Sequence, residues 1–158
     1  MSSNEQRTAD LMFAIGEMRP GDAAAALIVV DGERYLMQRR SETAGIFYPG
    51  HWGLFGGAAD AGEDLVSALR RELHEELTLE VDAASYFTEF TFDFSYLGLG
   101  RIVRRFYEVL LTSATVAEFV QHEGDEMGLF TAREILTEPR VVPYDAFAIW
   151  LHATRPGR

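Results

Sequence analysis

Leucines at every fourth position from Leu65 to Leu77 predict a helix that packs one apolar stripe against the rest of the chain. We expect this helix to run from about Asp64, a plausible N-cap, to Leu77. Glu72, Glu75 and Glu76 fall within about 100° of one another beside the stripe, because offsets of three and four residues return to the same face. One side of the helix therefore faces a core, and an adjacent side carries clustered carboxylates.

The glutamates belong to a longer pattern of fixed spacing. Gly57 is followed after five residues by Glu63 and, after seven more, by the run from Arg71 to Leu79, which reads RELHEELTL. On charge pattern alone, a solvated acidic helix face with i,i+4 support would explain these residues. The complete spacing instead favours a site for a hard divalent cation, because Mg²⁺ and Mn²⁺ prefer carboxylate and water oxygens.

This spacing resembles the signature of the Nudix hydrolases, metal-dependent enzymes that cut nucleoside diphosphates linked to another group. The resemblance implies a fold of the α/β (α+β) class, an α/β/α sandwich with a central mixed β-sheet. One position departs from the family pattern, because Thr78 stands where a glycine is usual. A β-branched residue resists the left-handed conformation of a glycine cap, so we expect the helix end to differ locally, at a cost of about 1 kcal/mol.

The resemblance also implies roles for single residues. Glu75 and Glu76 match the family's principal metal ligands, and Glu72 matches a glutamate that assists as ligand or base. Arg71 and Glu63 match a pair that orients neighbouring carboxylates, since a guanidinium can form forked hydrogen bonds with them. These five residues are the main catalytic candidates. The departure from the family pattern at Thr78 leaves all five in place.

Four further positions are candidates for the site. Gly56 and Gly57 would let the backbone approach the metal. Glu123, in a loop rich in acidic residues, is the candidate for an additional base or ligand, although ordinary loop acidity explains it too. Arg39, which with Arg40 ends an expected strand, could face substrate phosphates or be an ordinary surface arginine.

Aromatic residues offer less certain contacts with substrate. Tyr96 lies near the place where diadenosine-polyphosphate hydrolases of the family carry a tyrosine, but it continues an aromatic strand pattern, so we expect it to pack in the core. Tyr48, Trp52 and Phe55 could each stack on a base or fill the core. The sequence does not decide between these roles.

The remaining pattern predicts interleaved strands and helices in one domain that spans residues 1–158. An N-terminal extension, residues 1–22, is expected to hold a short amphipathic helix. Other expected elements are strands at 23–30, 35–39, 52–55, 90–96 and 101–111, a short strand before 130, and helices at 131–136 and 145–153.

The chain carries 14 basic and 25 acidic residues, a net charge of −11, which argues against nucleic-acid binding. Absence of cysteine excludes disulfides, thiolate metal sites and cysteine nucleophiles, and with them a cysteine-dependent isomerase of the same fold. No signal sequence or membrane-spanning run is apparent, so we expect a cytoplasmic protein that does not associate with membranes.

These observations predict a metal-dependent hydrolase that cleaves a pyrophosphate bond in a nucleoside diphosphate derivative by attack of water on phosphorus. Mg²⁺ is the expected cofactor, with Mn²⁺ as a substitute, and the partner is a small-molecule nucleotide. A homodimer is compatible with the sequence. The alternative is a non-catalytic nucleotide-sensing or interaction module of the same fold, although such modules usually lose part of the glutamate pattern.

Overall fold

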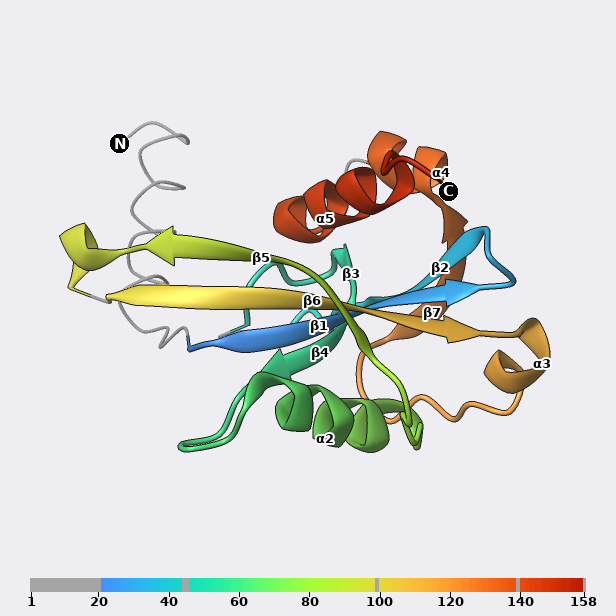
Figure 1. Ribbon diagram of the computed structural model, residues 1–158, viewed down its shortest axis with the longest axis horizontal. Coiled ribbons are helices and arrows are strands. Elements are labelled where there is room, and N and C mark those ends of the chain that lie inside the picture. Colours follow the sequence, from blue (N-terminus) through green and yellow to red (C-terminus); the bar gives the residue numbers. More distant parts are fainter. Residues whose placement is uncertain (1–20, 44–45, 99, 139, 158) are drawn as a thin grey trace.

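The strand β1 (Ala23–Val30) is apolar along its whole length because helices cover both faces of the sheet around it. Alternate residues of β1 enter different cores. Ile28 packs in the core beneath α2 (Leu65–Leu77), whereas Leu27 packs in the core beneath α5 (Pro143–Ala153). Figure 1 shows α2 on one side of the sheet and α5 on the other. The expected three-layer sandwich is confirmed.

The computed structural model describes residues 21–43, 46–98, 100–138 and 140–157. Its sheet is mixed, since β1 pairs in parallel with β6 and the other strand pairs are antiparallel. The strand order is β3-β2-β1-β6-β5, with β4 also beside β1 and β7 beside β2. The bounds are β2 Arg34–Arg39, β3 Trp52–Gly53, β4 Phe55–Ala58, β5 Ser85–Asp93, β6 Arg101–Leu111 and β7 Glu126–Thr131.

Most expected elements are confirmed, among them the strands at 23–30 and 101–111. The single strand expected at 52–55 is wrong. Leu54 separates β3, which pairs with β2, from β4, which pairs with β1 and continues through Gly56 and Gly57. The chain thus crosses from one strand partner to another just before the glycine pair, and this step carries the glycines to the N-terminal end of β1.

The strand expected at 90–96 begins earlier and ends earlier than predicted. β5 stops at Asp93, whose side chain accepts a hydrogen bond from Ser95 N at 3.0 Å and from Arg101 Nε at 3.0 Å. The 3₁₀ turn η1 (Ser95–Leu97) follows directly, so Tyr96 leaves the aromatic strand face and is 79% exposed. The prediction that Tyr96 packs in the core is therefore wrong.

At the C-terminal side, α4 (Ala132–Thr137) begins with a capping box between Thr131 and Glu134, and α5 begins two residues before the expected start. The short helix α3 (Ser113–Val116) was not predicted. The helix expected within residues 1–22 lies almost wholly outside the described residues. Among the helices of the described ranges, none is long and apolar enough to cross a membrane.

The helix α2 begins and ends at defined caps. Asp64 accepts hydrogen bonds from Val66 N and Ser67 N, as expected for an N-cap. At the other end Thr78 adopts the left-handed conformation, with φ 55° and ψ 29°, and its N–H donates to His74 O. The expectation of a different helix end is thus wrong. The helix ends in the left-handed cap that a glycine usually provides. Thr78 Oγ1 also lies 2.9 Å from His122 Nε2.

Replacing Thr78 with glycine should raise the free energy of unfolding by about 1 kcal/mol, because glycine adopts this conformation without the Cβ penalty. Urea denaturation measures the change. The matched control is Thr78→Ala, which keeps the Cβ and loses the contact with His122, so this variant should be less stable than the wild type. A glycine variant no more stable than the wild type would show that Thr78 is not strained.

Candidate functional site

Arg71 organises the acidic side of α2. Its Nε and Nη2 donate to the two oxygens of Glu63 at 3.1 and 2.9 Å, and Nη1 donates to Glu72 at 2.8 Å and to Glu75 at 3.4 Å. A further bond from Nη2 reaches Ala58 O in β4. The bonds from Arg71 lower the pKa of Glu63 and raise that of Arg71 itself. The forked pairing expected between Arg71 and Glu63 is present.

Glu76 is a buried carboxyl group, only 4% exposed. Gln38 Nε2 donates to its Oε1 at 2.8 Å, and Gly56 N donates to its Oε2 at 2.9 Å. Burial raises the pKa of Glu76 to about 7, with a smaller contribution from the charges of Glu72 and Glu123. The carboxylate form is therefore costly here unless a cation lies close by.

Glu72 lies against the backbone of the glycine pair. A Cβ on Gly57 would lie 2.5 Å from the Glu72 carboxyl carbon, so any larger residue at this position would displace that carboxyl group. At Gly56 the close neighbour is Ala24 O of β1, 2.2 Å from an added Cβ. Burial also raises the pKa of Glu72. The glycines thus bring β4 close to both the sheet and the carboxylates.

Glu123 lies in the loop before β7, next to the α2 glutamates. Its charge contributes to the raised pKa of both Glu72 and Glu76. The loop is tied to the end of α2, because His122 N donates to Glu76 O at 2.9 Å. We call Glu72, Glu75, Glu76 and Glu123 the carboxylate cluster.

The donor set of the carboxylate cluster fits Mg²⁺ or Mn²⁺, which bind hard oxygen ligands. The raised pKa values of Glu72 and Glu76 point the same way, since a bound cation would favour their ionised forms. In the described part of the chain, no three acidic or histidine side chains converge as a preformed cage. Arg71 engages Glu72 and Glu75 instead, and Gln38 engages Glu76.

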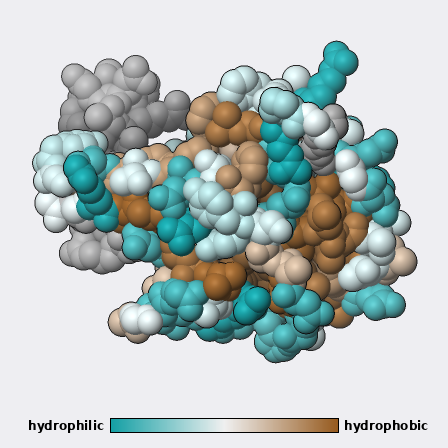
Figure 2. Space-filling model, in the orientation of Figure 1, coloured by the Kyte–Doolittle hydropathy of each residue, from teal (hydrophilic) through white to brown (hydrophobic). Residues whose placement is uncertain are grey.

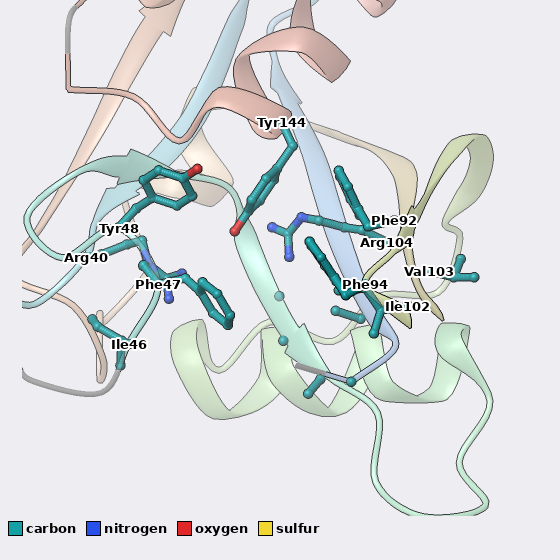
Figure 3. Close-up of a pocket in the computed structure, with 15 residues that line it drawn as sticks. Arg40, Ile46, Phe47, Tyr48, Phe92, Phe94, Ile102, Val103, Arg104 and Tyr144 are labelled. Atoms are coloured by element: carbon teal, nitrogen blue, oxygen red, sulfur yellow. The ribbon is translucent and has the colours of Figure 1, made fainter. Parts of the chain in front are cut away.

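A cavity of about 460 Å³ opens on the other side of the glycine pair, with Gly56, Gly57 and Ala58 in its wall. Figure 3 shows aromatic side chains grouped around it, from the loop before β3, from β5 and from the start of α5. Two cationic side chains, Arg40 and Arg104, also line it. The aromatic side chains are Phe47, Tyr48, Phe92, Phe94 and Tyr144. We call this cavity the aromatic pocket.

Several predicted contacts lie outside the aromatic pocket. Arg39 is not among its lining residues, and its Nε lies 3.6 Å from Glu126 instead. Arg40 lines the pocket and donates from Nε to Phe47 O at 2.8 Å. Tyr96 is also absent from the lining. Of these two arginines, it is therefore Arg40, the residue that follows β2, that lines the aromatic pocket.

Two of the three aromatic residues left open by the sequence belong to the packing of the fold. Phe55 is fully buried, and Trp52 packs against the ring of Phe130 with centroids 4.8 Å apart. Tyr48 lines the aromatic pocket and is 38% exposed. It is the one of the three that is available to a ligand.

Three site residues were missed from the sequence. Gln38 bonds with Glu76, and Asp145 forms an ion pair with Arg104 at 2.9 Å. Arg104 could have been noticed, because it shares the inward register of β6 with Ile102 and the buried Phe106. An arginine at such a position requires a buried partner.

Comparisons with known proteins found matches in both sequence and fold. A model of the NUDIX domain matches residues 19–153. The nucleoside triphosphatase NudI of Escherichia coli is 43% identical over 60 residues, which are 38% of this chain and 41% of that protein. The match thus spans about two fifths of the length of these curated relatives.

Two solved structures show the same fold. The MutT protein from Methanosarcina mazei Go1 superposes with a TM-score of 0.72 at 19% identity, covering 90% of this chain and 99% of that one. A MutT NUDIX hydrolase from Burkholderia pseudomallei superposes with a TM-score of 0.65 at 26% identity, covering 83% and 96%.

Proposed function

The chain belongs to the NUDIX domain family, and on this basis we propose that it is a metal-dependent hydrolase that cleaves a pyrophosphate bond in a nucleoside diphosphate derivative. The carboxylate cluster beside the aromatic pocket carries the proposal. Gly56 and Gly57 separate the two, so a ligand in the pocket would reach the cluster past a wall without side chains. A metal-assisted attack on a phosphate group needs this adjacency of cation and substrate.

In the proposed reaction Glu72, Glu75 and Glu76 hold Mg²⁺ or Mn²⁺. The bound cation would lower the pKa of a water molecule and offset charge that develops on the phosphate oxygens. Arg71 keeps Glu72 and Glu75 in place through its forked hydrogen bonds. Glu123 would accept a proton from the attacking water as the water oxygen bonds to phosphorus, and the bond from phosphorus to the oxygen of the leaving phosphate would break.

Nucleotides are the proposed substrate class. The aromatic pocket offers several rings on which a base can stack. Arg40 adds positive charge to this cavity in a chain of net charge −11, whereas the charge of Arg104 is balanced by Asp145. The name of the NudI relatives, nucleoside triphosphatase, supports the same class. A divalent cation would also bridge the acidic cluster and an anionic substrate.

The proposal is tested with a panel of nucleoside triphosphates, dinucleoside polyphosphates and nucleotide sugars, each with Mg²⁺, Mn²⁺ or a chelator. Anion-exchange chromatography identifies the products. We expect at least one compound to yield a nucleoside monophosphate only when the metal is present. Measurable binding without any product across the panel would contradict the proposal and favour a nucleotide-sensing module.

A further inference from the structure

Arg104, on β6, is held rigidly at the wall of the aromatic pocket. Its Nε and Nη2 both donate to Asp145 Oδ1, at 3.1 and 2.9 Å, and the side chain is 14% exposed. The guanidinium carbon lies 4.7 Å from the centre of the Tyr144 ring. Figure 3 shows the guanidinium group between Tyr144 and the two phenylalanines of β5 and its following residue, Phe92 and Phe94. Both contacts fix the plane of the group.

Part of this guanidinium remains available to a ligand. An arginine carries five N–H donors, and the bonds to Asp145 use one on Nε and one on Nη2. The two N–H groups of Nη1 and the second of Nη2 have no partner among the described residues. They form a fork at the end of the side chain, the arrangement that binds two adjacent acceptors.

Asp145 offers no comparable acceptor. It is 1% exposed, and its second oxygen, Oδ2, accepts a hydrogen bond from Leu54 N at 2.9 Å. With Oδ1 bonded twice to Arg104, both oxygens of the carboxylate are occupied. At this wall the pocket therefore presents donors, and a ligand must supply acceptors.

A neutral acceptor suits this fork better than a phosphate group. The pair of Arg104 and Asp145 carries no net charge, so the electrostatic attraction on an anion is weaker here than beside an unpaired arginine. The neighbouring rings of Tyr144, Phe92 and Phe94 favour a flat, aromatic ligand. The edge of a nucleobase combines such a ring with directional acceptors.

We propose that Arg104 is a specificity-determining residue, selecting bases whose edge presents acceptors over bases with an amino group there. On the edge that carries its 6-substituent, guanine presents two adjacent acceptors, O6 and N7, and on the corresponding edge uracil presents the acceptor O4, so both are of the selected kind. On this same edge adenine and cytosine carry amino groups, which would oppose donor to donor and leave at least part of the fork unpaired. This inference rests on the proposed function only in that it places a nucleotide in the aromatic pocket.

The test compares the wild type with Arg104→Lys, which keeps a positive charge beside Asp145 and loses the planar fork. For the wild type we expect kcat/KM to favour guanosine over adenosine triphosphate, and uridine over cytidine triphosphate, by about tenfold or more. In the variant both ratios should fall to within about threefold, mainly through KM. The matched control is Arg105→Lys, the next residue of β6, which pairs with Glu89 outside the pocket and should leave the ratios unchanged.

Fluorescence titration with the four nucleoside monophosphates separates this inference from the proposed function. If no compound is hydrolysed but the wild type still prefers guanosine and uridine monophosphates and Arg104→Lys does not, the inference stands and the hydrolase proposal fails. Unchanged ratios in a folded variant would overturn the inference, as would an equal loss for all four bases, which indicates contact with phosphate. A wild type that prefers adenine or cytosine, or has no preference, would overturn it without any variant.

Discussion

Replacing Glu76 with glutamine is expected to lower kcat/KM for metal-dependent hydrolysis by about a thousandfold while the protein stays folded. The change removes the negative charge of a proposed metal ligand and keeps its shape. Gly56 N can still donate to the new amide oxygen, and a rotated Gln38 amide can accept from the new amide nitrogen, because Gln38 and Gly56 are the two partners of this carboxyl group. The loss should therefore concern chemistry and not folding.

Initial rates at saturating Mg²⁺ measure this loss, with circular dichroism as the check on folding. Glu80→Gln is the matched control, since Glu80 is an exposed glutamate just beyond α2 that pairs with His74. The control should keep the rate of the wild type. A Glu76→Gln variant within about threefold of the wild type would remove Glu76 from the metal site.

Without metal, the free energy of unfolding should fall as the pH rises from about 4.5 to about 7 because of Glu76. Burial raises its pKa from the ordinary 4.5 of a glutamate to about 7 in the folded protein. The folded state thus holds the proton more tightly, so this contribution is complete below about pH 4.5 and is lost as the pH passes 7. The difference corresponds to about 3 kcal/mol.

Urea denaturation of the wild type and Glu76→Gln in the presence of a chelator isolates this contribution. Glu63 and Asp64 have lowered pKa values and act with the opposite sign, but they are present in both proteins and cancel in the difference. The glutamine variant should gain stability relative to the wild type as the pH rises. Mg²⁺ at pH 8 should then stabilise the wild type more than the variant. If the free energy of unfolding depended on pH in the same way in both proteins, Glu76 would not have a raised pKa in the folded state.

The parts of the site that the sequence predicted are those that depend on local geometry. The leucine stripe and the carboxylate face of α2 follow from helical periodicity. Arg71 and Glu63 are only eight residues apart, on either side of the N-cap Asp64, so their pairing is local as well. The apolar run at 23–30 likewise indicated a strand, and the structure shows that this strand, β1, is buried along almost its whole length.

The parts that were missed depend on contacts between distant segments. Gln38 meets Glu76 across 38 residues, and Arg104 meets Asp145 across 41, separations that no periodic pattern records. Tyr96 continued an alternating pattern, but the strand ends at Asp93, whose side chain accepts a hydrogen bond from Ser95 N at the start of η1. At Thr78 the hydrogen bonds of the helix end outweighed the conformational preference of a β-branched residue.

The claim that the carboxylate cluster holds a metal ion for hydrolysis is tested most directly by mass spectrometry of the products formed in ¹⁸O-labelled water. For a compound that the wild type cleaves, we expect one ¹⁸O atom in a phosphate-bearing product, formed with Mg²⁺, absent with a chelator and greatly reduced in Glu76→Gln. Equal product formation without the metal, or by the glutamine variant, would contradict the claim.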